Sequence, residues 1–351
     1  GDIATSDDRN SKFFHSILLA RYPRLSPRSA CGGPIYHLNS VAAWRFVGYY
    51  TIKTMSMYCS VSPGMGAWRQ PSRHCLHQEA GRGITVVMNT NHPRLIDSHF
   101  HLRSMERKGV DVISLLSEME AEGMEGIDVG LEGDDLGERI ERFGAWKNIR
   151  FAAGIGPWGV AEGQKPLAEQ LEALFLQVER NRPVAIGEIG LDNHWKYGTP
   201  ALQEQVLNVQ MEAAEERRLP IIIHNREADE QFITILGQRS FSRRGIFHCY
   251  QGGEALAHLA IEKGFFLSFA GPLTYKANRA MHRLFASLPL SSILLETDSP
   301  YLSPAPLRGK TNTPLSMIHI YREAARLRGM ETEELAEVVE ANYHTFLESN
   351  S

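Results

Sequence analysis

The chain of 351 residues is long enough for one large domain or two ordinary ones, and its hydrophobic fraction of 43% suffices for a sizeable core. Its apolar runs are far shorter than the roughly 20 residues of a membrane-spanning helix, so no such helix is expected. The net charge of −4 is uneven: residues 1–90 contain 10 Lys and Arg against 4 Asp and Glu, whereas the remainder contains 27 against 37. That acidic balance excludes a protein that holds nucleic acid by basic charge alone, so metal ions would have to supply much of the positive charge for any phosphate ligand.

Residues 1–90 differ from the rest of the chain in their sequence pattern, because Pro- and Gly-rich stretches interrupt their short apolar segments. The chain begins with Gly1, and Met88 stands just before the first regular pattern, so a start at Met88 would leave an ordinary domain of 264 residues. We expect residues 1–90 to be an extension without a recognised fold, partly disordered or foreign to the native protein, in front of a domain 91–351.

The cysteines favour a reducing compartment. The four cysteines show neither CxxC spacing nor a dense framework, and no stretch near the amino terminus reads as a signal peptide. We therefore expect a cytoplasmic setting. The cluster His74, Cys75 and His77 resembles half of a zinc site, but no second half follows at finger-like spacing, so we expect no zinc finger there.

From residue 95 onward, short apolar runs alternate with longer amphipathic stretches. Eight runs predict strands: Leu95–His99, Gly126–Gly130, Ile149–Ile155, Val184–Ile189, Pro220–His224, Gly245–Cys249, Phe265–Phe269 and Ile293–Thr297. Helical periodicity predicts seven helices, the last two of them after the final strand: Val112–Glu122, Leu167–Arg180, Gln203–Arg217, Ala255–Glu262, Asn278–Leu288, Leu315–Arg328 and Thr332–Leu347. Eight strands that alternate with helices over about 250 residues are typical of the α/β fold known as the (β/α)8 or TIM barrel.

A doubly wound open sheet is the alternative architecture. It would place a Gly-rich phosphate-binding loop directly after the first strand. Here His99, Phe100 and His101 occupy that place, which favours the closed barrel.

His99 and His101 stand one residue apart at the end of the first predicted strand. Residues i and i+2 of an extended backbone point to the same side, so both imidazoles can reach one metal ion. Taken alone, a His-x-His pair is as often an ordinary pair of core or surface histidines.

Four more ligand-type side chains stand in or at the ends of later predicted strands: Glu188 in the fourth, His224 in the fifth, His248 in the sixth and Asp298 after the eighth. In a closed parallel barrel the carboxyl ends of all strands meet at one rim, where the active sites of this fold lie. A single histidine of this kind is more often a hydrogen-bonded core residue, but six ligand-type side chains in or at the ends of five strands indicate a metal site. Three or four ligands suit one ion, and six suit two ions that share a carboxylate.

The order of these motifs resembles that of the TatD family, metal-dependent deoxyribonucleases of the amidohydrolase superfamily. The motifs are His-x-His, Gly-Glu-Ile-Gly-Leu-Asp, Ile-His-x-Arg-Glu-Ala, a late His-Cys, and Glu-Thr-Asp-Ser-Pro-Tyr-Leu. The resemblance covers roughly residues 95–347 and leaves residues 1–90 without a counterpart. It implies the same barrel that the strand pattern predicts.

The resemblance also implies two divalent ions held by six ligands: His99, His101 and Asp298 for the first, His224 and His248 for the second, and Glu188 as the bridge. Asp298 and Glu188 would be the catalytic carboxylates, with Asp298 as the general base that takes a proton from the attacking water. Histidine and carboxylate ligands suit Zn²⁺ or Mn²⁺, and two carboxylates are also compatible with Mg²⁺.

Two positions depart from the family pattern, and one of them follows Leu191-Asp192, where the family often carries aromatics and this chain has Asn193-His194-Trp195. The family usually has Gly-x-His-Pro after the third strand, whereas this chain has Gly154-Ile-Gly156-Pro157. A rim histidine implied in phosphate or substrate binding is therefore missing, which bears on rate or substrate choice more than on metal binding. Trp158 and His194 stand nearby in the sequence and could partly replace it.

The expected substrate is DNA, single-stranded or at its 3′ ends. Arg226 and Arg308 are candidates to bind its phosphate, because a guanidinium pairs bidentately with phosphate oxygens. The alternative for each arginine is a surface salt bridge.

Two other functions remain open. The same metal ligands would support hydrolysis of an amide, ester or lactone, although a carbamylated lysine would then be expected where Glu188 stands. An inactive metal-binding scaffold is the second alternative: the complete ligand set argues against it, and the missing rim histidine argues weakly for it.

Overall fold

The computed structural model describes residues 94–195 and 197–348. The expectations for the extension 1–90, including the start at Met88 and the cluster His74, Cys75 and His77, concern residues outside this part. Within the described part, no helix is both long and apolar enough to cross a membrane.

Eight parallel strands form one sheet, in which each strand pairs with the next along the chain. Backbone hydrogen bonds close the sheet: the N–H of His101 donates to the carbonyl of Ser299 at 2.8 Å, and the N–H of Asp298 donates to that of His99 at 2.9 Å. The strands are β1 (Ile96–Phe100), β2 (Glu125–Val129), β3 (Ile149–Ala153), β4 (Ala185–Asp192), β5 (Ile221–Arg226), β6 (Ile246–Phe247), β7 (Phe266–Phe269) and β8 (Ile293–Leu295). The predicted (β/α)8 barrel is confirmed.

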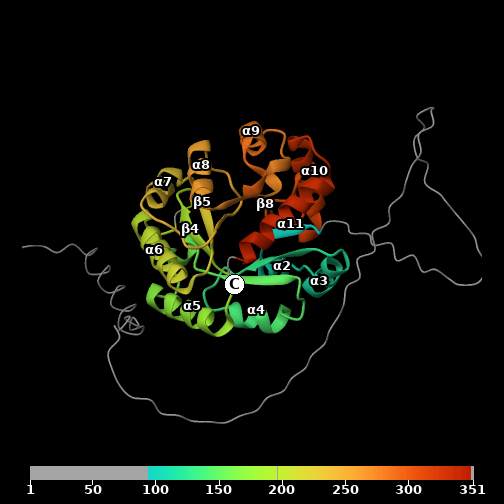
Figure 1. Ribbon diagram of the computed structural model, residues 1–351. Coiled ribbons are helices and arrows are strands. Elements are labelled where there is room, and N and C mark those ends of the chain that lie inside the picture. Colours follow the sequence, from blue (N-terminus) through green and yellow to red (C-terminus); the bar gives the residue numbers. More distant parts are fainter. Residues whose placement is uncertain (1–93, 196, 349–351) are drawn as a thin grey trace, which may run out of the picture. The chain divides into compact units, whose positions relative to one another are not determined.

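Helices surround the strands, as the ring of labelled helices in Figure 1 shows. The α-helices of the described residues are α2 (Leu102–Arg107), α3 (Val112–Ala121), α4 (Leu136–Phe143), α5 (Leu167–Asn181), α6 (Pro200–Arg217), α7 (Asp229–Gly237), α8 (Glu254–Glu262), α9 (Arg279–Ser287), α10 (Met317–Arg328) and α11 (Thr332–Glu348). The 3-10 helices are η1 (Pro157–Val160), η2 (Gly271–Thr274), η3 (Leu290–Ser292), η4 (Ala305–Leu307) and η5 (Pro314–Ser316). The seven predicted helices are present, whereas the sequence pattern does not predict α2, α4 and α7.

Local capping interactions define where several helices begin and end. The Asp111 carboxylate accepts the backbone N–H of Ser114 at 3.1 Å at the start of α3. The Thr199 hydroxyl accepts that of Leu202 at 3.2 Å at the start of α6. Gly329, at φ 65°, ends α10 in the left-handed conformation that glycine adopts most easily.

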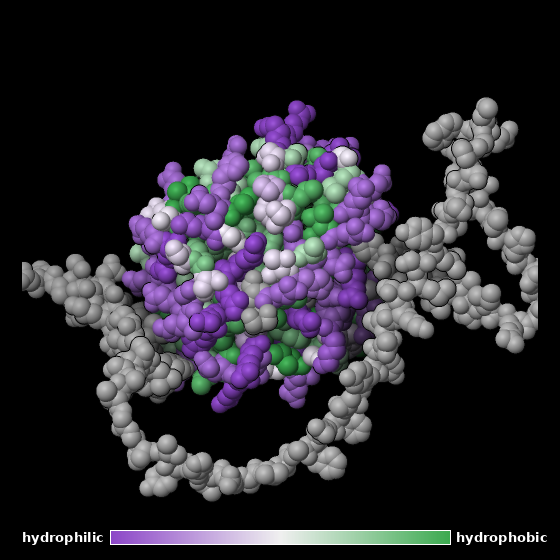
Figure 2. Space-filling model, in the orientation of Figure 1, coloured by the Kyte–Doolittle hydropathy of each residue, from purple (hydrophilic) through white to green (hydrophobic). Residues whose placement is uncertain are grey.

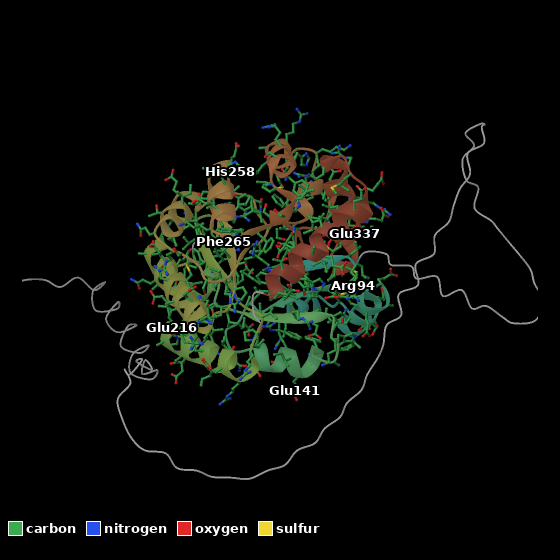
Figure 3. All side chains as sticks on the ribbon, viewed as in Figure 1. Arg94, Glu141, Glu216, His258, Phe265 and Glu337 are labelled. Atoms are coloured by element: carbon green, nitrogen blue, oxygen red, sulfur yellow. The ribbon has the colours of Figure 1, made fainter. Side chains whose placement is uncertain are left out.

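The core lies inside the barrel and between the strands and the helices. Every residue of β1, β2, β4, β7 and β8 is buried, as expected for parallel strands that are covered on both faces. On the face seen in Figure 2, hydrophilic residues are interspersed with hydrophobic ones. In Figure 3, Glu141, Glu216 and His258 lie on the outer helices, whereas Phe265, which is 2% exposed, lies further inward. The chemistry of this packed barrel is therefore expected at the strand ends.

Candidate metal centre

The six predicted ligands come together at the carboxyl ends of the strands. Each lies in a strand or in the loop after it: His99 and His101 at β1, Glu188 in β4, His224 in β5, His248 after β6 and Asp298 after β8. All but His224 are buried. The structure thus places the six side chains in one cluster, and their role as metal ligands stays a prediction.

Glu188 lies between two pairs of histidines and presents one carboxylate oxygen to each pair. Its Oε2 is 3.3 Å from His99 Nε2 and 3.9 Å from His101 Nε2. Its Oε1 is 2.7 Å from His224 Nδ1 and 2.8 Å from His248 Nε2. A carboxylate placed in this way can interact with both pairs of histidines at once, one through each oxygen.

Potential ligand atoms form two overlapping groups of three that share His99. The first group combines His99 with His101 and Asp298, the second combines it with Glu188 and His248, and within each group the atoms lie within 4.8 Å of one another. Asp298 Oδ1 is 3.4 Å from His101 Nε2. The backbone of Asp298 has φ 54°, a left-handed conformation that is uncommon outside glycine and often marks a functional site.

A backbone carbonyl orients the ring of His101. His101 Nδ1 lies 2.8 Å from the carbonyl oxygen of Val129, which can only accept a hydrogen bond. The proton of the neutral imidazole therefore belongs on Nδ1, and the lone pair of Nε2 is directed at His99, Glu188 and Asp298. An outer hydrogen bond of this kind is the usual support of a metal-binding histidine.

Asp192 supports His224 in a similar way. Asp192 Oδ2 lies 3.3 Å from His224 Nε2, so Nδ1 on the other side of the ring is free to face Glu188. The second oxygen of Asp192 accepts the backbone N–H groups of His194 at 2.9 Å and Trp195 at 2.8 Å. One buried carboxylate thus connects a predicted ligand with the loop between β4 and α6.

Two glycines of β4 allow the neighbouring strand to approach Glu188. A Cβ atom at Gly190 would lie 1.9 Å from the carbonyl oxygen of His224, and one at Gly187 would lie 2.6 Å from Ile222 Cβ. Any side chain at either position would therefore push β5 away from β4. The glycines around Glu188 thus serve the close packing that brings His224 to it.

Three buried carboxylates behind the ligands are not among the predicted site residues: Asp97, Asp192 and Glu296. Glu296 Oε1 lies 3.4 Å from His248 Nδ1, without the geometry of a hydrogen bond. Asp97 accepts the backbone N–H and the hydroxyl of Thr297 at 2.9 and 2.6 Å, which ties β1 to the loop after β8. The available signal was their position, because each stands two or four residues from a predicted ligand.

Burial and mutual charge determine the protonation of the cluster. Burial acts to raise the pKa of Glu188, but the surrounding histidines, His248 first, hold it well below its usual range. Burial and His248 lower the pKa of His99. Burial opposes protonation of His101, yet Asp298 and Glu188 outweigh burial and raise its pKa. Glu188 is therefore ionised and gives the cluster a negative centre.

The donor set fits divalent cations. His99 Nε2 and His101 Nε2 lie 3.3 Å apart beside the Glu188 carboxylate, and imidazole and carboxylate are ligands that Zn²⁺ and Mn²⁺ accept. Among the described residues, the buried atoms His99 Nδ1, His248 Nδ1 and Glu296 Oε2 have no hydrogen-bond partner. A buried polar cluster of this kind is costly unless something compensates its desolvation, which a bound cation would do.

Two cavities meet at this cluster. One of 640 Å³ is bordered by the loops after β5 and β6, and one of 940 Å³ is bordered by residues from the loops after β1 to β4. His224, His248, Asp298 and Arg226 line both cavities. The volumes lie within the usual range of small-molecule sites, so a ligand can reach the cluster from either side.

The structure separates the two arginines that the sequence proposes as phosphate ligands. Arg226, at the end of β5, lines both cavities and forms no ion pair within the described part of the chain. The Arg308 guanidinium lies 4.5 Å above the centre of the Tyr275 ring, and Arg308 does not line either cavity. Arg226 is therefore the better placed of the two.

Trp158 fills the space beside Gly156, where the sequence lacks the rim histidine. A Cβ atom at Gly156 would lie 2.3 Å from the Trp158 ring. The Trp158 indole lines the larger cavity and meets the His224 ring edge-on, with the ring centres 5.9 Å apart. His194 instead faces Glu227, with Nδ1 2.8 Å from its carboxylate. Of the two proposed replacements, Trp158 is the one that borders the cavity.

Comparison with known proteins agrees with this architecture. The profile of the family described as TatD related DNase matches residues 96–348. An uncharacterized metal-dependent hydrolase YabD of Bacillus subtilis is 33% identical over 250 residues, which are 71% of this chain and 96% of that protein. The 3′-5′ ssDNA/RNA exonuclease TatD of Salmonella typhimurium is 31% identical over 56% of this chain and 76% of its own length. The crystal structure of YJJV, a TatD homologue from Escherichia coli, superimposes with a TM-score of 0.66 at 27% identity, over 72% of this chain and 98% of that one.

Proposed function

We propose that this chain, which belongs to the TatD family of metal-dependent hydrolases, cleaves phosphodiester bonds of DNA. The observation that carries the proposal is the position of Glu188, whose two oxygens face two separate pairs of histidines. A carboxylate between two sets of ligands supports a two-metal site, which is a common means of phosphodiester hydrolysis.

In this proposal the six predicted ligands would hold two divalent ions, Zn²⁺, Mn²⁺ or Mg²⁺. His99, His101 and Asp298 would hold one ion, His224 and His248 would hold the other, and Glu188 would be shared between them. When bound, such ions make a water molecule more acidic and neutralise charge on the phosphate. This contribution agrees with the acidic balance of residues 91–351, where 27 Lys and Arg stand against 37 Asp and Glu.

The side chains around the cluster supply the remaining functions. Asp298 lines both cavities, so its carboxylate is accessible to a water molecule. As the general base, Asp298 takes a proton from this water molecule when the water attacks a bound phosphate. Glu188 stays ionised and holds its histidine neighbours in place. Arg226 binds a non-bridging phosphate oxygen, whereas Arg308 on Tyr275 contributes less.

The substrate that we propose is single-stranded DNA, attacked at a 3′ end. Support comes from the relative in Salmonella typhimurium that is named as a 3′-5′ ssDNA/RNA exonuclease. The cavities at the cluster are also of a size for a few nucleotides rather than for a long duplex footprint. A cytoplasmic setting is part of the same proposal and rests on the cysteine pattern.

The test is hydrolysis of a 5′-labelled oligonucleotide by the purified chain, with metal content measured in parallel. We expect degradation that chelation abolishes and that added Mn²⁺, Mg²⁺ or Zn²⁺ restores, and we expect Asp298→Asn to be inactive. Asp111→Asn, which alters a helix cap on α3, is the matched control and should keep full activity. Full activity of Asp298→Asn would refute the mechanism.

The same assay distinguishes the two alternatives. Hydrolysis of lactone or amide substrates without any cleavage of the oligonucleotide would favour the amidohydrolase-type function. Stoichiometric metal without hydrolysis of any of these substrates would favour the inactive scaffold.

A further inference from the structure

Two tryptophans from different loops line the larger cavity beside the metal centre. Trp158 belongs to η1 after β3, and Trp195 belongs to the loop between β4 and α6. We propose that these two indoles bind the nucleobase next to the scissile bond, so that they determine specificity for unpaired bases. This inference rests on the proposed cleavage of DNA and adds to it the residues that recognise the base.

Trp195 is an exposed aromatic residue that lines the larger cavity. It is 55% exposed, and it is one of four large hydrophobic side chains that are exposed within the described residues. Two of these four, Trp195 and Tyr301, line this one cavity, whereas Ile113 and Leu176 lie on helices and do not. Exposed apolar rings that line one cavity are typical of a binding surface.

One hydrogen bond holds the backbone of Trp195, and another holds the ring of Trp158. The backbone N–H of Trp195 donates to the Asp192 carboxylate at 2.8 Å. Trp158 Nε1 donates to the carbonyl oxygen of Leu131 at 2.8 Å, which fixes the plane of the indole. A fixed aromatic surface loses little conformational entropy when a base stacks on it.

Gly156 is required by the Trp158 ring and not by its own backbone. Gly156 has φ −73°, a conformation open to any residue, but a Cβ atom there would lie 2.3 Å from the indole. The position of the Trp158 ring therefore depends on the absence of a side chain at Gly156. In this position an aromatic ring, instead of a charged or hydrogen-bonding group, lies next to His224.

The cations of the same cavity leave little to hold a polyanion beyond one phosphate. Arg107, Lys165 and Arg226 line it, but Arg107 is paired with Glu132 and Lys165 with Asp134, and Arg226 is assigned to the phosphate at the metal centre. Beyond the phosphate at the metal centre, the binding energy must then come largely from the aromatic rings. Stacking on an indole requires a base with at least one face that is not stacked on a neighbouring base, which favours single strands and frayed ends.

The decisive comparison uses two oligomers of equal length and charge, one of thymidine and one of abasic tetrahydrofuran units. We expect the wild-type chain to have a KM for the abasic oligomer about 5- to 100-fold above that for the thymidine oligomer, the range expected for loss of base stacking. Trp195→Ala and Trp158→Ala should raise the KM for the thymidine oligomer within the same range and leave that for the abasic oligomer nearly unchanged.

Further variants separate stacking from simple apolar contact. Trp195→Phe keeps an aromatic face and should retain most of the affinity, whereas Trp195→Leu should behave like Trp195→Ala. Gly156→Ala should displace the indole and reproduce the Trp158→Ala effect, but should add nothing in a Trp158→Ala background. Ile113→Ala, an exposed apolar residue outside the cavity, is the matched control and should leave both KM values unchanged.

A binding measurement provides a readout that is independent of turnover. In an Asp298→Asn background, the thymidine oligomer should quench tryptophan fluorescence, and the abasic oligomer should not. Cleavage of both oligomers with equal KM, or unchanged KM in the tryptophan variants, would overturn this inference and leave the proposed function intact. No cleavage of either oligomer by the metal-loaded chain would overturn both.

Discussion

Asp192 Oδ2 faces His224 Nε2 at 3.3 Å, on the side of the imidazole opposite Glu188. The histidine is therefore held between two carboxylates, one in the candidate metal centre and one behind it. Because Asp192 Oδ1 also accepts the backbone N–H of Trp195, the same side chain supports a predicted metal ligand and a proposed base-binding residue. These two functions are separable by substitution.

Asp192→Asn should weaken metal binding without releasing the loop. The asparagine oxygen can still accept the backbone N–H of Trp195, but its amide group cannot accept a hydrogen bond from His224. We expect metal affinity to fall by about 10- to 100-fold, as for other outer partners of metal-binding histidines, with the KM for oligonucleotide nearly unchanged at saturating metal. Competition with a chromophoric chelator measures the first quantity, and steady-state kinetics measures the second.

Asp192→Ala should have both effects, because it also removes the acceptor for the loop. The KM for a thymidine oligomer should then rise in addition to the loss of metal affinity. Wild-type metal affinity in Asp192→Asn would show that His224 does not depend on this carboxylate.

Removal of metal should destabilise the barrel. A cation that binds only the folded state stabilises it by about 2.7 kcal/mol at a concentration 100-fold above its Kd. For a domain of this size, that corresponds to a decrease in Tm of about 5–10 °C after chelation. Scanning calorimetry with and without chelator measures the shift. In Glu188→Gln, which lacks the shared carboxylate, chelation should change the Tm much less, and an equally large shift there would contradict the assigned ligand set.

The strand pattern predicts the barrel because parallel strands covered on both faces are nearly continuous apolar runs. The ends of the strands are less predictable, since they depend on partners. β4 extends to Asp192 because that residue pairs in register with Arg226 on β5. β6 ends at Phe247, earlier than predicted, because Cys249 at φ 42° leaves the extended conformation. These deviations occur where the chain turns toward the candidate site.

The same distinction holds for the side chains of the candidate site. Convergence of the six predicted ligands follows from topology alone, because the carboxyl ends of all strands meet at one rim. The stacking of Arg308 on Tyr275 and the packing of Trp158 over Gly156 depend on the conformation of irregular loops, which has no periodic signal in the sequence. The supporting role of Asp192 depends on a side-chain contact between two strands.

The two candidate phosphate ligands should differ in effect. Arg226→Ala removes an unpaired guanidinium from both cavities, and the loss of a hydrogen bond to a charged phosphate should raise the KM for oligonucleotide by about 10- to 100-fold. Arg308→Ala removes a cation that lies on the Tyr275 ring outside the cavities, so its effect should be several-fold smaller. Parallel kinetics of the two variants at several salt concentrations decides the assignment, and the reverse order would place the phosphate near η4.

Helix α4 contains two arginines whose substitution compares the contribution of a buried and an exposed ion pair to the stability of the barrel. Arg139 is 1% exposed, and its guanidinium donates to the carboxylates of Asp128 and Asp135, each at 2.8 Å. Arg142, one turn further along, is half-exposed and pairs with Glu106. Arg139→Met leaves two buried carboxylates without their cation and should cost about 3–5 kcal/mol of unfolding free energy.

Arg142→Met breaks only a solvent-exposed pair and should cost less than about 1 kcal/mol. For a domain of this size, the Arg139 variant should unfold about 6–20 °C below the wild type, while the Arg142 variant stays within a few degrees of it. Chemical denaturation of the two variants side by side provides the free energies. Equal stabilities would mean that Asp128 and Asp135 find other partners or become protonated, in which case acidification should stabilise the Arg139 variant relative to the wild type.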